Sequence, residues 1–287
     1  MKGAVFTVNG LIMDMQRKSE LSEIARQIRI GIIEAVHSAK SGHPGGSLSI
    51  ADVLAYLYNE EMNIDPAKPT CECRDRLVLS KGHCAPGLYA ALANRGYFPV
   101  EDLKTFRHTT SYLQGHPDMK HTPGVDMSSG SLGQGASVSC GMALASKMDN
   151  HSRRIYAILG DGETQEGEVW EAAMFAAHYK LDNLVAIVDF NGLQIDGKVT
   201  EVMNPTPLDE KFAAFGWNVC VIDGHDLDQI ADAFAKAREV KGKPTAIIAK
   251  CVKGKGVSFM EDQVSWHGSA PKDDQYEQAV AELKANA

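Results

Sequence analysis

Two apolar stretches, each followed by a polar residue, decide the fold of this 287-residue chain. Residues 155–162 read Ile-Tyr-Ala-Ile-Leu-Gly-Asp-Gly, and residues 184–191 read Leu-Val-Ala-Ile-Val-Asp-Phe-Asn. The segment between them, Glu168–Lys180, has the pattern of a helix. Two strands joined by one helical crossover should be parallel neighbours, with their carboxyl ends side by side. Asp161 and Asn191 are therefore predicted to converge at the sheet edge where α/β folds bind ligands.

The residues at these two strand ends predict a site for a hard cation and a phosphate. A carboxylate, an amide oxygen and a nearby backbone carbonyl suit Mg²⁺ or Ca²⁺, and they do not suit zinc. Gly160 and Gly162 let the backbone approach a ligand closely, and the N–H groups that open the next helix favour an anion. A turn with a capping Asp would explain Gly-Asp-Gly alone. Asn191, at the end of its own strand, makes the ligand site the more specific interpretation.

The rest of the chain predicts an α/β fold, with a parallel sheet covered by helices on both faces. Apolar residues recur at helical spacing over Leu21–Ala39. The other expected helices are Ile50–Met62, Ser137–Met148, Leu227–Val240 and Asp274–Ala285, and the strands are Leu77–Leu79, Ile155–Leu159, Leu184–Val188, Trp217–Ile222 and Thr245–Cys251. Gly96–Gly135 lacks a regular pattern, and long irregular segments are usually functional. We divide the chain into an N-terminal extension, residues 1–18, and one domain, residues 19–287.

Charge and hydropathy exclude two classes of partner. The net charge of −8 argues against non-specific binding to nucleic acid. Every apolar run is shorter than the roughly 20 residues that a membrane span requires. Met1–Gln16 has one basic residue before its apolar part and no clear cleavage site, so we interpret it as an extension and expect a cytoplasmic protein. Cys71 and Cys73 do not have the spacing of zinc frameworks, and their role stays open.

Several further motifs occur in one fixed order along the chain. They are Ser41-Gly42-His43-Pro44-Gly45, Leu79-Ser80-Lys81-Gly82-His83, Gly115-His116-Pro117, Leu132-Gly133-Gln134-Gly135, Gly160-Asp161-Gly162-Glu163, Asn191-Gly192, Asp223-Gly224-His225 and His267-Gly268. The Gly-Asp-Gly and Asn pair resembles the diphosphate-binding motif of thiamine diphosphate enzymes. The whole series, over roughly residues 20 to 275, resembles the transketolases. The resemblance implies the thiamine diphosphate-binding fold of the PP type.

The resemblance also implies a site for thiamine diphosphate and Mg²⁺, with Ca²⁺ as a substitute. Asp161, the side chain of Asn191 and the main-chain carbonyl of Leu193 would hold the metal. Gly162 would donate its N–H to the diphosphate, which Asn191 would also contact. The remaining cofactor-binding positions are His83, Gly130, Ser131, Leu132, Ile195 and His267, and Ser131 replaces the proline that is usual in the family.

Four histidines match active-site positions of the family. Any one loop histidine is more often structural than catalytic, and His43 and His116 each precede a proline and could be turn residues. All four together favour catalysis. By the resemblance, His43 and His116 bind the hydroxyls of a sugar donor, and His83 and His267 lie near the diphosphate or the reacting centre. We assign His43, His116 and His267 as catalytic, because a neutral imidazole can accept or donate a proton.

The remaining polar residues receive weaker interpretations. Glu166 and Glu171 match acids near the family's subunit interface, although solvated helix carboxylates would explain them equally well. Glu163 receives no role. Residues 253–256, Lys-Gly-Lys-Gly, lack the spacing of a P-loop and are interpreted as a flexible loop ahead of His267. The other histidines, His37, His108, His121, His151, His178 and His225, are treated as structural.

The function implied by the resemblance is transfer of a two-carbon ketol unit from a ketose phosphate to an aldose phosphate. Because the chain ends where a full-length transketolase would begin its second domain, we expect the N-terminal subunit of a split enzyme. A separate C-terminal, pyrimidine-binding subunit would complete a two-plus-two assembly. The alternatives are a chain of a deoxyxylulose phosphate synthase-like enzyme, the α chain of a 2-oxo acid dehydrogenase, and a non-catalytic regulatory subunit of the same fold. A Mg²⁺-dependent phosphate hydrolase would need a nucleophile motif that we do not find.

Overall fold

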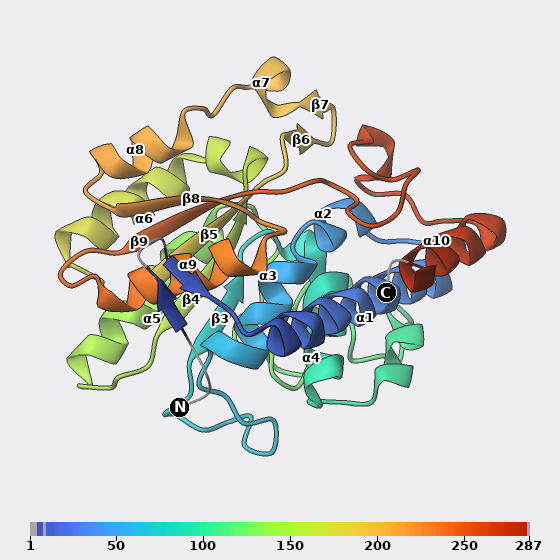
Figure 1. The fold of residues 1–287 in the computed structure, drawn as a ribbon, viewed down its shortest axis with the longest axis horizontal. Helices are drawn as coiled ribbons and strands as arrows, with labels where there is room; N and C mark the ends of the chain where they lie inside the picture. Colours follow the sequence, from blue (N-terminus) through green and yellow to red (C-terminus); the bar gives the residue numbers. More distant parts are fainter. Residues whose placement is uncertain (1–4, 8–9, 286–287) are drawn as a thin grey trace.

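The centre of the molecule is a five-stranded parallel sheet in the order β3-β4-β5-β9-β8 (Figure 1). The computed structural model describes residues 5–7 and 10–285. The strands are β3 Arg76–Leu79, β4 Ile155–Gly160, β5 Leu184–Phe190, β8 Asn218–Asp223 and β9 Thr245–Lys250. All five predicted strands are confirmed, with ends shifted by one or two residues, which is the usual uncertainty of an element boundary.

Strands β4 and β5 are the parallel neighbours that the sequence predicted. Their register pairs Ile158 with Ile187 and Gly160 with Asp189, so both strands end at the same edge. Helix α6, Gly167–His178, is the crossover between them. The two strands are almost entirely buried, which explains why each is a continuous apolar run.

Helices cover both faces of the sheet, and the side chains of β4 divide between two cores. Tyr156 and Ile158 point to the first core, and Ile155, Ala157 and Leu159 point to the second. The first core includes residues of α1 Met15–Ala39, α2 Pro44–Leu48, α3 Ala51–Tyr56, α4 Ala85–Arg95, α9 Leu227–Glu239 and α10 Asp273–Ala285. The second includes residues of α5 Gln134–Met148, α6 and α8 Leu208–Ala214. The predicted α/β layers are therefore confirmed.

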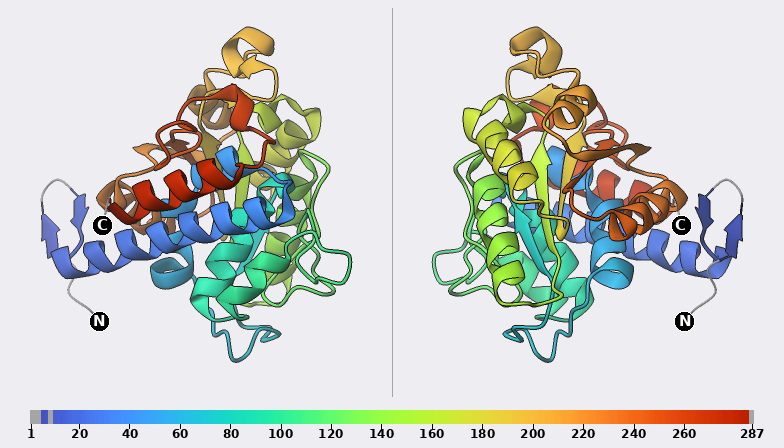
Figure 2. Two further views of the ribbon diagram at one scale, coloured as in Figure 1. Left: turned by 90° about the vertical axis from the view of Figure 1, so that its right-hand side faces the viewer. Right: turned by 90° about the vertical axis from the view of Figure 1, so that its left-hand side faces the viewer.

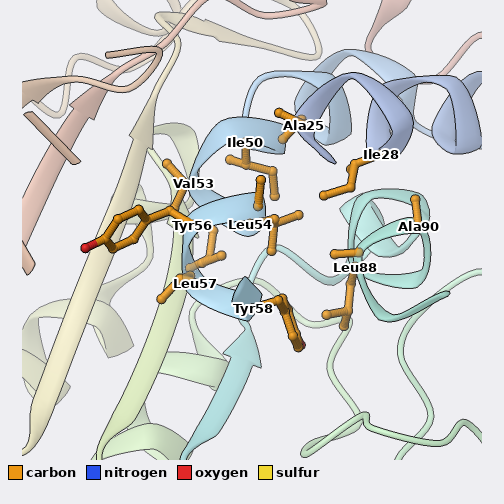
Figure 3. Close-up of a cluster of buried hydrophobic side chains, with 14 of the residues drawn as sticks. Ala25, Ile28, Ile50, Val53, Leu54, Tyr56, Leu57, Tyr58, Leu88 and Ala90 are labelled. Carbon is orange, nitrogen blue, oxygen red and sulfur yellow. The ribbon is translucent and has the colours of Figure 1, made fainter. Parts of the chain in front are cut away.

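The first core is dense where α1, α3 and α4 meet. Ile28 of α1, Leu54 of α3 and Leu88 of α4 lie in one cluster (Figure 3). Helix α10 lies alongside α1 on the outside of this layer (Figure 2). Contacts of this kind fix α2 and the loop before it, which carries His43, above the sheet edge.

Several helices differ from the sequence-based expectation. The predicted helix Ile50–Met62 is α3 followed by a π-helical segment, Leu57–Glu61. Helix α4 was not predicted, because its residues 85–93 are all buried and the segment therefore has no polar face. Helix α8 was missed because it has only seven residues. Within the expected irregular segment 96–135, the structure adds a 3₁₀ helix at Val100–Thr105.

The N-terminal part contains a short antiparallel hairpin, β1 Val5–Thr7 with β2 Gly10–Ile12. Helix α1 begins at Met15, where the side chain of Asp14 accepts a hydrogen bond from Gln16 N–H at 3.2 Å. Residues 15–18 of the predicted extension thus form the first turn of α1, and residues 1–4 and 8–9 lie outside the described residues. None of the described helices is long and apolar enough to cross a membrane.

After β5, beyond the edge at which β4 and β5 end, the chain forms a separate two-stranded sheet. The chain forms a small hairpin from β6 Leu193–Gln194 and β7 Gly197–Lys198, followed by α7 Val199–Val202. This hairpin and α7 project from the body of the molecule (Figure 1).

Cys71 and Cys73, in the segment before β3, form a disulfide, with their Cα atoms 5.4 Å apart.

Candidate active site

Asp161 stands directly after β4 and is only 2% exposed. Its Oδ1 accepts the N–H of Gly162 at 2.8 Å, and its Oδ2 accepts the N–H of Gly192 at 2.5 Å. Gly192 follows Asn191, so the predicted convergence of the two strand ends is confirmed. Burial, together with the nearby carboxylate of Asp189, raises the pKa of Asp161 to about 6. The charge of Lys253 lowers this pKa only in part, and a metal ion bound to the carboxylate would favour its ionised form further.

Asn191 and Leu193 offer two more oxygen atoms beside this carboxylate. The Nδ2 of Asn191 donates to Asp189 Oδ2 at 2.8 Å, and the Oδ1 of Asn191 accepts the N–H of Leu193 at 3.1 Å. The carbonyl oxygen of Leu193 accepts a hydrogen bond from Lys253 Nζ at 2.9 Å. The three predicted ligands therefore lie together, and one of them already binds a cationic group. This set of carboxylate, amide and carbonyl oxygens fits Mg²⁺ or Ca²⁺.

Lys253 is a site residue that the sequence analysis missed. The expected flexible loop is wrong at this position, because Lys253 is 2% exposed and its Nζ lies 3.0 Å from His267 Nδ1. Burial lowers the pKa of the Lys253 ammonium. Strand β9 is a parallel neighbour of β5, and Lys253 comes three residues after its end. The convergence argument that found Asn191 could therefore have found Lys253.

Three of the four predicted histidines are in ring contact. The ring centroids of His43, His83 and His267 lie 5.1 to 5.4 Å from one another. His116 lies nearby against Gly130, where a Cβ would be 3.4 Å from the His116 ring. The Nδ1 of His43 is buried and has no hydrogen-bond partner among the described residues. Such an atom is available to a ligand.

Burial keeps these imidazoles neutral. It lowers the pKa of His43 and His83 to about 4, and that of His267 to about 3. Neighbouring cationic groups add to the effect, with His83 beside Lys81 and His267 beside Lys253. Burial also lowers the pKa of His116. At neutral pH each ring therefore has one nitrogen that donates and one that accepts.

Most of the predicted residues border a cavity of about 260 Å³, but the predicted catalytic residues His43 and His116 are not in its lining. Its lining comprises Gly46, Lys81, His83, Leu132, Gly160, Asp161, Gly162, Glu163, Gln165, Glu166, Asn191, Leu193, Gln194, Ile195, Lys253 and His267. Of the predicted cofactor positions, Gly130 and Ser131 are not in this lining; they are exposed and precede Leu132. Glu166 lies at the cavity, and Glu171 lies on an exposed face of α6. Their role at an interface stays a prediction.

Glu163, to which the sequence analysis gave no role, joins three segments around the cavity. It is 3% exposed, and its two oxygens accept the N–H groups of Gly133 and Gly160, each at 2.9 Å. The hydroxyl of Ser80, just beyond β3, also donates to it. Glu163 thus ties the start of α5 and the end of β3 to the turn after β4. No spacing in the sequence indicates these contacts.

The comparison with known families identifies the family to which this chain belongs. The family described as the thiamine diphosphate-binding domain of transketolase matches residues 21–286. The chain belongs to the transketolase family. The prediction of a transketolase-family chain with the N-terminal, thiamine diphosphate-binding domain is thereby confirmed.

Related proteins agree with this assignment. The chain is 48% identical over 269 residues to the 6-deoxy-6-sulfo-D-fructose transketolase subunit SqwG of a Clostridium species, which covers 94% of this chain and 98% of that protein. It is 44% identical over 252 residues to an apulose-4-phosphate transketolase subunit of Phocaeicola vulgatus, and the match covers 88% of this chain and 89% of that protein. The transketolase structure from Campylobacter jejuni superimposes with a TM-score of 0.87 at 35% identity, covering 95% of this chain and 43% of that one. The chain thus corresponds to less than half of a single-chain transketolase and to nearly all of a transketolase subunit.

Proposed function

We propose that this chain binds thiamine diphosphate through Mg²⁺ and, with a second polypeptide, transfers a two-carbon ketol unit from an anionic ketose to an aldose phosphate. The observation that carries the proposal is the convergence of Asp161, Asn191 and Leu193 in one cavity that His83 and His267 also line, with His43 in ring contact with both histidines. Family membership supports the cofactor. The metal is supported by the oxygen donors and by the raised pKa of Asp161.

In this proposal, charged and oxygen-bearing groups of the cavity bind the anionic diphosphate, and the neutral histidines bind the uncharged part of the substrate. Asp161, Asn191 and the Leu193 carbonyl would hold Mg²⁺, which would offset the negative charge of the diphosphate. The buried ammonium of Lys253 adds a positive charge beside them. When bound, thiamine diphosphate supplies the carbon nucleophile that the side chains of the protein lack.

The histidines then act on the sugar. His43 and His116 bind the donor hydroxyls, and a neutral ring accepts a proton from one hydroxyl oxygen and returns it at a later step. His267, which contacts both His43 and His83, is placed to do the same nearer the cofactor. The low pKa values keep both rings neutral at neutral pH, so that the unpartnered Nδ1 of His43 is open to a ligand, whereas the Nδ1 of His267 faces Lys253 Nζ.

A second polypeptide is supported by the apolar residues around the cavity. Leu132 and Ile195 line the cavity and are 39% and 63% exposed, and Met203, shortly after the β6–β7 hairpin, is 65% exposed. Large apolar side chains left exposed beside a cavity favour association with another protein. The related proteins from Clostridium and Phocaeicola are both named as subunits. The partner that we propose is the pyrimidine-binding transketolase subunit, in a two-plus-two assembly.

The names of the relatives support a ketose with an anionic terminus as the donor. One relative is named for a sulfonated fructose, and another for a 4-phosphate of apulose. A Pichia stipitis transketolase structure, with a TM-score of 0.87 at 33% identity, is described as a complex with sedoheptulose 7-phosphate. Phosphate and sulfonate share a negative, tetrahedral end group. A donor of this class would enter with its carbonyl toward the histidines.

The test compares the chain alone with the chain plus its partner, each saturated with Mg²⁺ and thiamine diphosphate. Ketol transfer from phosphorylated and sulfonated ketoses should occur in the presence of the partner and be absent without it. Full turnover by the single chain would refute the two-chain proposal. Turnover of pyruvate in place of a ketose would favour a 2-oxo acid enzyme instead.

A further inference from the structure

Beneath the proposed cofactor site lies an ion pair that is almost completely excluded from water. The side chains of Lys81 and Asp189 are 2% and 0% exposed, and Lys81 Nζ lies 2.5 Å from Asp189 Oδ2. Removing two charges from water is costly, so an ion pair of this kind is weak evidence for stability alone. Its contacts therefore need another explanation.

The Lys81 ammonium and the Asp189 carboxylate join three segments, which are helix α2, the end of strand β5 and the turn after β3. Lys81 Nζ also donates to the carbonyl of Gly46 at 2.8 Å, and Asp189 Oδ2 also accepts the hydroxyl of Ser49 at 2.6 Å. Gly46 belongs to the segment that follows His43, while Lys81 precedes His83 and Asp189 precedes Asn191 by two residues each. One buried pair thus sets the spacing of three segments that each present a predicted site residue.

The same carboxylate fixes the direction of the Asn191 amide. Asp189 Oδ2 accepts the Nδ2 of Asn191 at 2.8 Å. The amide oxygen is consequently turned away from Asp189, and it accepts the N–H of Leu193. If the amide turned over, its NH₂ group would replace the oxygen as the atom that faces a cation, and NH₂ cannot ligate a metal ion.

We propose that Lys81 and Asp189 are positioning residues that preform the metal and diphosphate site by orienting the Asn191 amide and by holding the loops of His43, His83 and Asn191 together. The inference rests on the proposed function, because it concerns the same site. Partners behind a metal ligand commonly contribute 10- to 100-fold to metal affinity. Neither residue needs to touch the cofactor to have this effect.

The first experiment compares Asp189→Asn with Asp126→Asn. Asp126 is a matched control, since its side chain is 2% exposed, is paired with Arg74 and accepts the N–H of Leu77 at the opposite end of β3. Each variant removes the charge of one buried carboxylate. Mg²⁺ affinity is measured by calorimetry in the presence of thiamine diphosphate on the chain assembled with its partner, well below the unfolding temperature. We expect at least a tenfold loss for Asp189→Asn and a change below twofold for Asp126→Asn.

A second variant separates positioning from folding. The double substitution Lys81→Met with Asp189→Leu replaces the ion pair by apolar side chains, a change that is often neutral for stability. We expect a melting temperature near that of the wild type and a Mg²⁺ affinity at least tenfold weaker. Wild-type affinity in this folded variant, or equal affinities for Asp189→Asn and Asp126→Asn, would overturn the inference. A wild-type protein that binds neither Mg²⁺ nor thiamine diphosphate would overturn the proposed function as well.

Discussion

Replacing Asp161 by Asn should stabilise the metal-free chain while abolishing its response to Mg²⁺. Burial and the neighbouring carboxylate of Asp189 raise the pKa of Asp161 to about 6. Its value in an unfolded chain is about 4, and two pKa units correspond to about 3 kcal/mol. Because the folded-state pKa is the higher one, the ionised carboxylate destabilises the fold above pH 6, and this cost disappears as the pH falls from about 6 towards 4.

The net gain is smaller than the electrostatic cost. Asp161 accepts two N–H groups, from Gly162 and Gly192, and an Asn side chain can accept only one of them. The lost hydrogen bond costs about 1 kcal/mol. The Asn variant should therefore be more stable by about 1 to 2 kcal/mol at pH 8, a rise of roughly 2 to 3 °C in melting temperature for a domain of this size. At about pH 4, where the electrostatic cost has disappeared, the variant should be less stable than the wild type by up to about 1 kcal/mol, because it still lacks that hydrogen bond.

Two measurements check this prediction. Thermal unfolding of the metal-free chain is recorded between pH 4 and 8, and Mg²⁺ affinity is measured by calorimetry with thiamine diphosphate on the assembled protein. In the wild type, affinity should fall about tenfold for each pH unit below 6, because the ligand must lose its proton. The control is Asp196→Asn, which removes an exposed charge in the β6–β7 turn and should leave Mg²⁺ binding intact. Equal wild-type affinity at pH 5 and pH 7, or tight binding by the Asp161→Asn variant, would refute the reasoning.

Three other outcomes are expected. His43→Ala and His116→Ala should each lower kcat/KM for the ketose donor by about 10²-fold or more, while calorimetry shows thiamine diphosphate affinity within a few-fold of the wild type; unchanged kinetics would make both histidines structural turn residues. Leu54→Ala should lower the free energy of unfolding by about 2 to 5 kcal/mol in denaturant titrations, because Leu54 is fully buried in the first core; a loss below 1 kcal/mol would contradict that packing. Ile195→Asp should weaken association with the partner subunit in sedimentation experiments, and an unchanged complex would place the interface elsewhere.

The strands were predictable because burial on both sides leaves a strong local signal. Strands β4 and β5 are apolar along nearly their whole length, and each is closed by a polar residue. Helix α4 gives no such signal, since its residues 85–93 are buried on every side and cannot alternate between polar and apolar faces. The helix over Ile50–Met62 was found, but its change to π-helical geometry at Leu57 depends on packing that a local pattern does not record.

The candidate site was predictable only in part, for a similar reason. Asp161 and Asn191 follow from strand order, because parallel neighbours end at one edge. The four histidines came from family resemblance, and the ring contacts of His43, His83 and His267 join segments that are far apart in sequence. Glu163 and Asp189 were not assigned, since their partners lie on other segments and a buried carboxylate looks like a surface one in sequence.

The distribution of charge in the site follows from what each part must bind. A diphosphate with a divalent ion needs fixed charges and oriented dipoles. Asp161, Lys253 and Lys81 line the cavity, and Asp189 is paired with Lys81 beneath it. A sugar is uncharged near its carbonyl and needs groups that can both donate and accept. The buried histidines meet this need because burial and neighbouring cations lower their pKa values to about 3 to 4. Lys81 and Lys253 would thus help to keep His83 and His267 neutral. Replacing either lysine should therefore alter the protonation of His83 or His267 as well as the binding of the anion.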